Sequence, residues 1–150
     1  MHPLFKIISA IESSDNYTAL RFEPSVYRKI SSLAASQSDL AIISKIKKIN
    51  NCSTETAYIL YSSSFGAVQI MGFNIWGSLG LTCSYYEFLN SESAQQVAFA
   101  AFLEKLRLAN ETPESLLNQK NRDTFAGRYN GDVAAYSPLL LKSINQHGYK

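Results

Sequence analysis

Glu12 is the residue whose position points most directly to chemistry. It lies four residues after Ile8 on the apolar stripe of a helix expected over residues 3–13, near the carboxyl end of that helix. Removal of the carboxyl from water and the partial negative charge of the helix end both favour its protonated form. A carboxyl of this kind can act as a general acid near neutral pH. The alternative is a glutamate that only ends the helix and points into water.

The run 64–74 mixes small residues, one amide and large apolar groups in a way that a plain core helix does not need. Its two glycines permit close approach of the backbone to a ligand, or close packing of helices. Gln69 can donate and accept hydrogen bonds, which suits the acetamido and hydroxyl groups of an aminosugar. Met71 and Phe73 could pack on sugar faces or belong to the core. We interpret the run as one wall of a binding site.

The segment 128–131, Arg-Tyr-Asn-Gly, ends a helix expected over residues 121–129. Gly131 is well placed to terminate that helix in the left-handed conformation. Taken alone, the segment is a capped helix end with an exposed tyrosine.

In their order along the chain, these segments resemble the N-acetylmuramidase family found in bacteriophage endolysins, over about residues 4–136. The motifs that carry the resemblance are Ile11-Glu12-Ser13, Phe22-Glu23, Ser64-Phe65-Gly66, Gln69-Ile70-Met71-Gly72-Phe73-Asn74 and Arg128-Tyr129-Asn130-Gly131. The resemblance implies a lysozyme-like fold and Glu12 as the proton donor. It also implies that Tyr129 hydrogen-bonds near Glu12 or the substrate and that Asn130 braces the backbone. The residues expected to bind the saccharide are Ser64, Gln69, Met71, Phe73, Tyr129 and Asn130.

Hydrolysis of a glycosidic bond usually needs a second carboxylate, either about 5 Å away as a nucleophile or further away to hold a water. The candidates are Asp15 and Glu23. Asp15 lies in a Ser-Asp-Asn cluster that is typical of a turn. Glu23 follows a strand-like piece and precedes Pro24, so it could face the cleft or cap the helix that Pro24 begins. Because the family has a Phe-Glu pair at this point, the resemblance favours Glu23 as the second catalytic residue.

The positions of the histidines and cysteines argue against a Ser-His-Asp catalytic set and against a metal site. His2 and His147 lie near the two ends of the chain, so neither a Ser-His-Asp set nor a histidine-based metal site is expected. Cys52 and Cys83 have neither Cys-x-x-Cys spacing nor histidine neighbours. Two free thiols are the expectation, with a disulfide as the alternative. We expect no metal and no cofactor.

Helical periodicity dominates the elements that must position these residues. Residues 84–87 have capping-box spacing, and residues 112–113 place a cap before a proline. A strand-like piece covers residues 17–22. The predicted fold is mainly α, a lysozyme-like single domain over residues 1–150 with at most a small β element near residues 17–22. Helices are predicted near residues 3–13, 24–34, 38–50, 53–62, 66–79, 84–90, 92–109, 113–120, 121–129 and 133–146.

Composition sets the remaining expectations. The chain has 150 residues, of which 46% are hydrophobic, and a net charge of +2. This is enough for one buried core and gives no nucleic-acid footprint. The apolar run in residues 1–10 is too short for a signal peptide or a membrane span. We expect a monomer without stable membrane insertion or nucleic-acid binding, made in the bacterial host cytoplasm. The resemblance to phage endolysins implies that the host is bacterial and that the protein acts on peptidoglycan glycan strands in the periplasm or cell wall, or is carried in the virion.

The resemblance implies cleavage of the β-1,4 bond between N-acetylmuramic acid and N-acetylglucosamine, with Glu12 as general acid and Glu23 in assistance. Two alternatives remain open. A lytic transglycosylase needs only one glutamate, because the sugar's own 6-hydroxyl attacks and an anhydro product forms. A wall-binding or virion structural protein would keep the fold without turnover.

Overall fold

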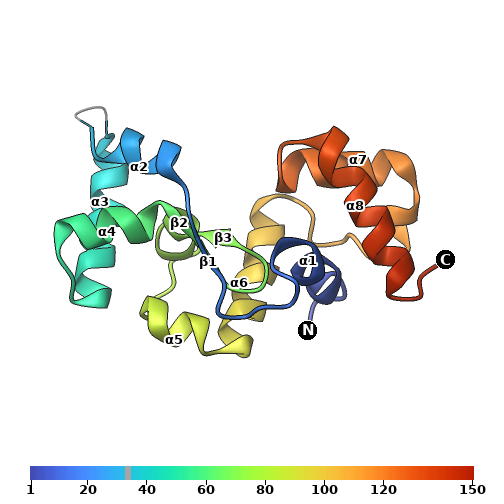
Figure 1. Ribbon diagram of the computed structural model, residues 1–150, viewed down its shortest axis with the longest axis horizontal. Helices are drawn as coiled ribbons and strands as arrows, with labels where there is room; N and C mark the ends of the chain where they lie inside the picture. The colour runs from blue at the N-terminus through green and yellow to red at the C-terminus, as the bar shows by residue number, and fades with distance from the viewer. Residues whose placement is uncertain (33–34) are drawn as a thin grey trace.

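The computed structural model describes residues 1–32 and 35–150 and is mainly helical. In this part of the chain the α-helices are α1 (Phe5–Glu12), α2 (Pro24–Ile30), α3 (Gln37–Asn50), α4 (Thr54–Tyr61), α5 (Tyr85–Leu89), α6 (Glu92–Lys105), α7 (Gln119–Tyr129) and α8 (Val133–Gln146). Two shorter helical segments are a π-helix, η1 (Phe73–Ser78), and a 3₁₀ turn, η2 (Ser115–Leu117). Figure 1 shows α2, α3 and α4 gathered at one end of the molecule, α1, α7 and α8 at the other, and α6 between the two groups.

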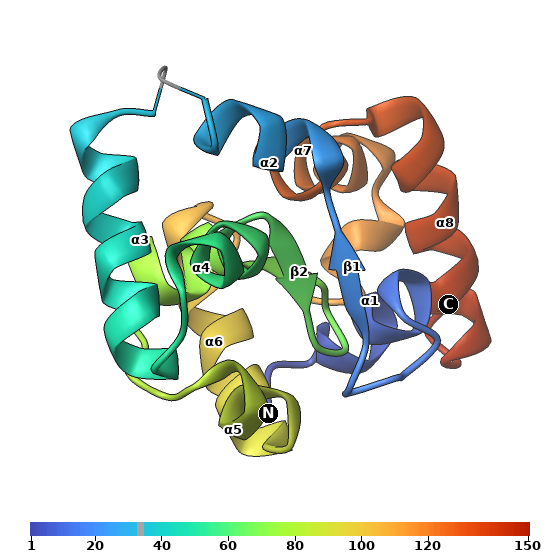
Figure 2. The same ribbon diagram turned by 60° about the vertical axis from the view of Figure 1, so that its left-hand side comes forward.

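A small antiparallel sheet lies where the two groups meet. Its strands pair in the order β1, β2, β3. In the register, Arg21 lies opposite Ser64, and Ser64 lies opposite Met71. Figure 2 shows β1 and β2 side by side, between α4 and α1. The sheet therefore brings residues from two distant parts of the chain close to the end of α1. The strands span Leu20–Phe22 (β1), Ser63–Phe65 (β2) and Ile70–Met71 (β3).

The predicted helix over residues 66–79 is wrong in its first half, where the chain forms the β2–β3 hairpin. Gly66 (φ +77°) and Gln69 (φ 51°) both take the left-handed conformation, which a tight hairpin turn uses and a helix does not. Gly66 also has no room for a side chain, because a Cβ there would lie 2.4 Å from Oε1 of Gln95. The helical part begins only at Phe73.

Two other predicted helices are shorter in the structure than the sequence indicated. The helix predicted over residues 92–109 stops at Lys105, and Arg107 then takes a left-handed φ of 59°. The segment 113–120 is not a helix of its own, since only the short turn η2 forms there. Asn118 instead caps the following helix, where its side chain accepts hydrogen bonds from the first backbone N–H groups of α7.

The remaining differences are at element ends. The strand-like piece at 17–22 is extended only from Leu20 onward, and the sheet has two strands beyond it. The helix predicted over residues 24–34 ends at Ile30, and residues 33 and 34 of that prediction lie outside the described residues. The prediction of a mainly α fold with a small β element is confirmed. No helix in the two described ranges has both the length and the apolar character needed to cross a bilayer.

A buried glutamine of α6 fixes the hairpin in place. Gln95 is fully buried, and its Oε1 accepts a hydrogen bond from the backbone N–H of Ala67 at 2.8 Å. Its Nε2 donates to the carbonyl oxygens of Tyr17, at 2.8 Å, and Phe88, at 3.1 Å. The hydroxyl of Ser13 donates to the carbonyl of Ala67 at 2.8 Å. The hairpin turn is thus bonded both to α6 and to the residue that follows α1.

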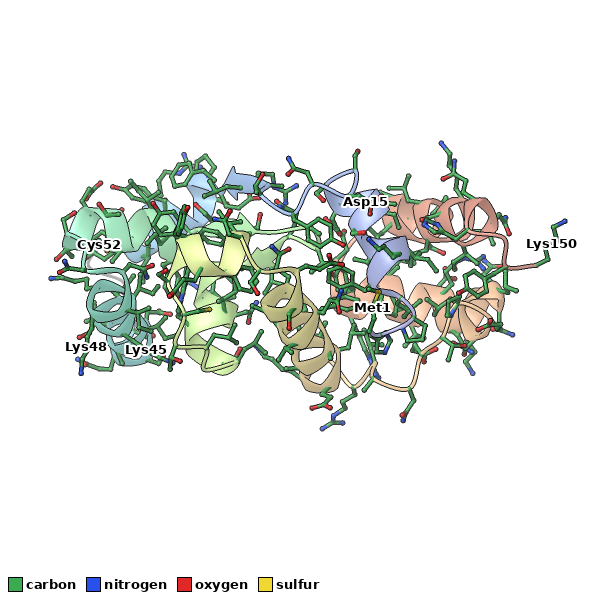
Figure 3. The ribbon with its side chains drawn as sticks, turned by 90° about the horizontal axis from the view of Figure 1, so that it is seen from below. Met1, Asp15, Lys45, Lys48, Cys52 and Lys150 are labelled. Carbon is green, nitrogen blue, oxygen red and sulfur yellow. The ribbon has the colours of Figure 1, made fainter. Side chains whose placement is uncertain are left out.

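The two cysteines are free thiols, as expected. Cys52 lies with Lys45 and Lys48 at the outer end of the group formed by α3 and α4 (Figure 3). Burial raises the pKa of both Cys52 and Cys83. A raised pKa leaves less thiolate, so neither side chain is an activated nucleophile.

Candidate active site

Glu12 is the last residue of α1, and its half-buried side chain meets α8. The hydroxyl of Tyr136 donates a hydrogen bond to Oε1 of Glu12 at 2.6 Å, and Tyr136 itself is only 4% exposed. Farther along α8, the hydroxyl of Ser143 donates to the carbonyl of Ile7 at 3.0 Å. The packing of α8 on α1 therefore sets the direction of the Glu12 carboxyl.

Burial raises the pKa of Glu12 above the usual value of a glutamate, because a charged carboxylate is disfavoured away from water. The hydrogen bond from Tyr136 and the positive charge of Arg21 lower the pKa, since both favour the carboxylate. Burial is the largest of these effects. The result is a carboxyl that keeps its proton to higher pH than an ordinary glutamate and still has partners for its anion, as a general acid requires.

Tyr129 stands between two other aromatic rings. Its ring stacks on Phe125, with centroids 5.4 Å apart, and on Tyr136, with centroids 5.9 Å apart. The Tyr129 hydroxyl donates to the carbonyl of Val68 in the hairpin turn at 2.9 Å. Tyr129 thus joins α7 to the hairpin, while the direct hydrogen bond to Glu12 comes from Tyr136.

The segment 128–131 ends α7 as the sequence predicted. Gly131 has a φ of +90°, the left-handed conformation of a helix terminator. The side-chain oxygen of Asn130 accepts a hydrogen bond from the backbone N–H of Asp132 at 3.3 Å. Asn130 therefore braces the turn that leads into α8.

A cavity of about 290 Å³, the Glu12 pocket, opens beside the carboxyl. Six of the eight candidate residues line it, and the other two, Ser64 and Glu23, do not. Residues from β1, the hairpin, η1, α6 and α7 contribute to its wall, so it lies where the two helix groups meet. The lining residues are Glu12, Arg21, Gln69, Met71, Phe73, Asn74, Phe102, Tyr129 and Asn130.

Ser64 lies behind the pocket wall and supports Gln69. Ser64 is 1% exposed, and its hydroxyl donates to Oε1 of Gln69 at 2.8 Å. Nε2 of Gln69 donates to the carbonyl of Gly66 at 2.8 Å. Both ends of the Gln69 amide are therefore bonded inside the hairpin, which fixes its orientation.

Neither candidate for a second carboxylate lines the pocket. Glu23 accepts a hydrogen bond at Oε1 from Nε of Arg21 at 2.7 Å, and it is Arg21 that faces the cavity. Asp15 lies in the turn after α1, the role that its local sequence predicted, where its carboxylate accepts a hydrogen bond from the hydroxyl of Ser9. Glu23 therefore reaches the site only through Arg21.

Asn74 is held in the pocket wall by a lysine at the end of α6. Nζ of Lys105 donates to Oδ1 of Asn74 at 2.7 Å and to the hydroxyl of Ser78 at 2.8 Å. Within the described chain, Nδ2 of Asn74 has no hydrogen-bond partner, although Asn74 is only 7% exposed. Lys105 thus fixes the amide with its oxygen turned toward α6, which leaves the nitrogen as a donor for a ligand.

Comparisons with known proteins identify the family of the chain. The family model for N-acetylmuramidase matches residues 9–138. The chain belongs to the N-acetylmuramidase family. As a member of that family, it is a peptidoglycan-degrading enzyme. It is also 40% identical over 150 residues to the endolysin of Enterobacteria phage PRD1, covering 99% of each chain. No solved structure matches the chain significantly.

Sequence reasoning missed three residues that line this family member's pocket, Arg21, Asn74 and Phe102, and also Tyr136 beside it. Arg21 stands two residues before Glu23, so the period of a strand places both on one face, and that signal was available. Asn74 is the last residue of the motif at residues 69–74, but it was not among the residues expected to bind the saccharide. Tyr136 had no local signal, because its partner Glu12 is 124 residues away in the chain.

Proposed function

We propose that residues 1–150 act as one catalytic domain that hydrolyses the β-1,4 bond between N-acetylmuramic acid and N-acetylglucosamine. Glu12 is the general acid. The observation that carries the proposal is the half-buried Glu12 carboxyl, with its raised pKa, in the wall of a cavity that also has amide and aromatic lining. Such a lining suits an aminosugar, because aromatic faces pack on the ring and amides bind its acetamido group. The proposed setting is that of an endolysin or a virion-borne lysin, which reaches the wall from the host cytoplasm or with the particle.

In this mechanism, protonated Glu12 donates its proton to the glycosidic oxygen, which leaves as a hydroxyl group of the departing sugar. A water molecule bonds to the anomeric carbon in its place and releases a proton. The Glu12 carboxylate that remains accepts the hydrogen bond from Tyr136 and lies near the positive charge of Arg21. Both interactions favour the charged form, so they strengthen as the proton leaves. Asn74 donates from Nδ2 to a substrate oxygen and helps to hold the sugar in position.

A lytic transglycosylase is the second candidate, and one observation favours it. Among the described residues, Glu12 is the only carboxylate that lines the pocket. A hydrolase would need Glu23 or a water held by other groups, whereas the transglycosylase uses the substrate's own 6-hydroxyl as the nucleophile. Under hydrolysis, Glu23 assists by holding Arg21 against the substrate.

Substitution Glu12→Gln tests the acid directly. The amide keeps the shape and can still accept from Tyr136, but it has no acidic proton to deliver, so clearing of peptidoglycan in a zymogram should be lost. Glu104→Gln is the matched control, because it makes the same charge change at an exposed position of α6 and should clear normally. Clearing by Glu12→Gln at the wild-type rate would overturn the assignment.

The same variant has a predicted effect on stability. Because the folded-state pKa of Glu12 is raised, its contribution to stability is fully present below the pKa of an unfolded glutamate and is lost as pH rises through the folded pKa. Glu12→Gln lacks this loss, so its Tm at pH 7 should equal or exceed that of the wild type. Wild-type activity should fall as pH rises through the same pKa. A Tm well below wild type at pH 7 would mean that the lost clearing reports misfolding.

Product analysis separates the two reactions. Digested sacculi are examined by mass spectrometry for the ends of the glycan fragments. Reducing N-acetylmuramic acid ends are the expected result, whereas 1,6-anhydro ends would replace hydrolysis by the transglycosylase reaction. If neither kind of new end forms and the protein still binds sacculi, it is a wall-binding protein without turnover.

A further inference from the structure

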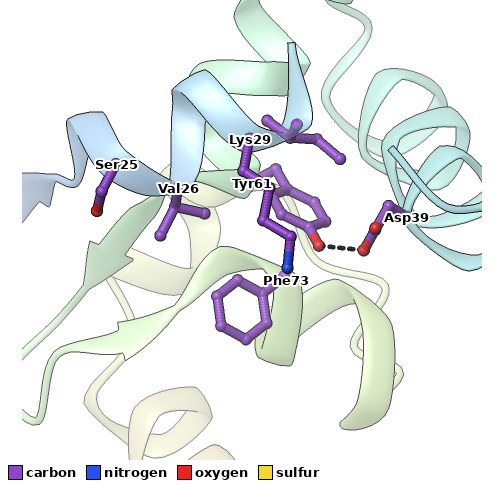
Figure 4. A pocket seen from close by; sticks show the side chains of 7 residues that line it. Ser25, Val26, Lys29, Asp39, Tyr61 and Phe73 are labelled. Carbon is purple, nitrogen blue, oxygen red and sulfur yellow. Dashed lines mark hydrogen bonds between the residues drawn. The ribbon is translucent and has the colours of Figure 1, made fainter. Parts of the chain in front are cut away.

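A second and larger cavity of about 560 Å³, the Lys29 cavity, adjoins the Glu12 pocket. Phe73 lines both cavities, so the two lie next to each other at this ring. Figure 4 shows the cavity between α2, which carries Val26 and Lys29, and the rings of Tyr61 and Phe73. Apart from Phe73 of η1, its lining residues come from α2, α3 and α4, the helix group that does not carry Glu12.

One wall of the Lys29 cavity is aromatic and is held in place by packing and hydrogen bonds. The rings of Tyr61 and Phe73 pack together with centroids 5.4 Å apart. The Tyr61 hydroxyl donates to the carboxylate of Asp39, which also accepts from the hydroxyl of Ser36. These hydrogen bonds and, to a smaller extent, the positive charge of Lys29 lower the pKa of Asp39, so it stays ionised and holds the Tyr61 ring in place.

Lys29 is the side chain of this cavity that is available to a ligand. It is exposed in the last turn of α2, and within the described chain its Nζ has neither a hydrogen bond nor an ion pair. In Figure 4 its amine points toward Phe73. Asp39, by contrast, already has hydrogen-bond donors. The cavity therefore offers a positive charge next to an aromatic wall, which fits a ligand with both a carboxylate and small apolar groups.

We propose that the Lys29 cavity binds the carboxylate-bearing peptide branch that peptidoglycan carries on its N-acetylmuramic acid units. The inference rests on the proposed function, because it takes peptidoglycan as the substrate of the Glu12 pocket. The sugar rings of intact peptidoglycan are uncharged, so they offer Lys29 hydrogen-bond acceptors but no ionic partner, whereas the peptide branch has carboxylates and alanyl methyl groups. With a sugar at Glu12, the branch extends past Phe73, where Lys29 pairs with a carboxylate and Val26 contacts a methyl group.

The test compares two substrates. One is intact peptidoglycan, and the other is the same material after an amidase has removed the peptide branches and the lactyl carboxylates that this frees have been capped as methylamides. Lys29→Gln should lower kcat/KM on intact peptidoglycan roughly fivefold, mostly through KM, as expected for an exposed ion pair. On stripped strands it should match the wild type within about twofold. Lys29→Arg should keep most of the activity on both substrates.

Arg28→Gln is the matched control, because Arg28 precedes Lys29 in the same helix turn, has the same charge and does not line the cavity. It should leave both rates unchanged. Equal losses with Lys29→Gln on both substrates would overturn the proposal in favour of a role in glycan binding or folding. No loss on either substrate would remove Lys29 from recognition altogether.

A binding measurement keeps this inference separate from the proposed catalysis. A synthetic L-Ala-D-Glu-diaminopimelate tripeptide is titrated into the Glu12→Gln protein and followed by NMR. We expect saturable chemical-shift changes at Val26, Tyr61 and Phe73 in the Glu12→Gln protein, and we expect them to disappear in the double variant Glu12→Gln/Lys29→Gln. If the Glu12→Gln protein shows no such changes, the inference is overturned. If the wild type fails to cut stripped strands, this titration decides the role of Lys29. Peptide binding by a wild type that makes no new glycan ends would contradict the proposed function alone.

Discussion

The two sides of the Glu12 pocket are built in different ways. On the side of α1, α7 and α8, the carboxyl lies among packed aromatic rings, with Tyr129 stacked between Phe125 and Tyr136. On the side of the hairpin and η1, the wall consists of polar side chains held by other polar groups, such as Gln69 by Ser64 and Asn74 by Lys105.

This difference fits the proposed roles of the two sides, an acid on one and a sugar-binding wall on the other. An acid keeps its proton near neutral pH when its surroundings disfavour charge, and packed rings achieve this by excluding water. A wall that holds a sugar needs donors and acceptors with fixed directions, and hydrogen bonds to buried partners fix them. The comparison predicts that substitutions on the aromatic side change the pH dependence of activity. Substitutions on the polar side should instead change the stability of the protein or its binding of substrate.

Gly66→Ala should have the largest effect, because it breaks the polar side at its anchor. A side chain at Gly66 requires a strained φ and displaces Gln95 from its buried hydrogen bonds, so unfolding free energy should fall by about 3 kcal/mol. Urea denaturation measures this loss. Gly80→Ala is the control, since Gly80 has a similar φ of +70° with nothing within 4 Å of a Cβ. Equal losses in the two variants would show that contact with Gln95 is unimportant.

Lys105→Met tests the polar side without breaking the hairpin. With its anchor removed, Asn74 is free to rotate, and kcat/KM should fall about tenfold, as for the loss of one hydrogen bond to a charged group. The loss should appear mainly in KM, with an unchanged pH profile. The same substitution in an Asn74→Ala background should have no further effect. A full additional loss there would mean that Lys105 acts independently of Asn74.

Tyr136→Phe tests the aromatic side and should have the smallest effect. The lost hydrogen bond favours the carboxylate, so its removal raises the pKa of Glu12 further and moves the alkaline limb of the activity profile to higher pH. We expect a loss of roughly threefold in kcat at the optimum, because the departing anion has one partner fewer. Tyr129→Phe should leave the limb in place, since its hydroxyl bonds to Val68. A limb that moves to lower pH in Tyr136→Phe would reverse the proposed role of the tyrosine.

Local patterns were sufficient for most of the helical framework. The capping box at Ser84 and Glu87 is present, and Gly131 ends α7 in the predicted conformation. Where prediction went wrong, a long-range contact decided the conformation. The run that begins at Gly66 resembles a helix in composition, but Gln95 of α6 bonds the backbone of Ala67 and holds the segment as a hairpin.

By itself, the sequence determined the mainly helical fold, the family resemblance and the residue types that could form the Glu12 pocket. Helical periodicity and caps are local, so a short stretch of chain contains all of their information. Only the tertiary structure decided that Tyr136 donates to Glu12, that Lys105 holds Asn74, and that Glu23 bonds to Arg21 outside the pocket. The environment of Glu12, the proposed acid, is created by the packing of α8 on α1, and that contact joins residues 124 positions apart in the chain.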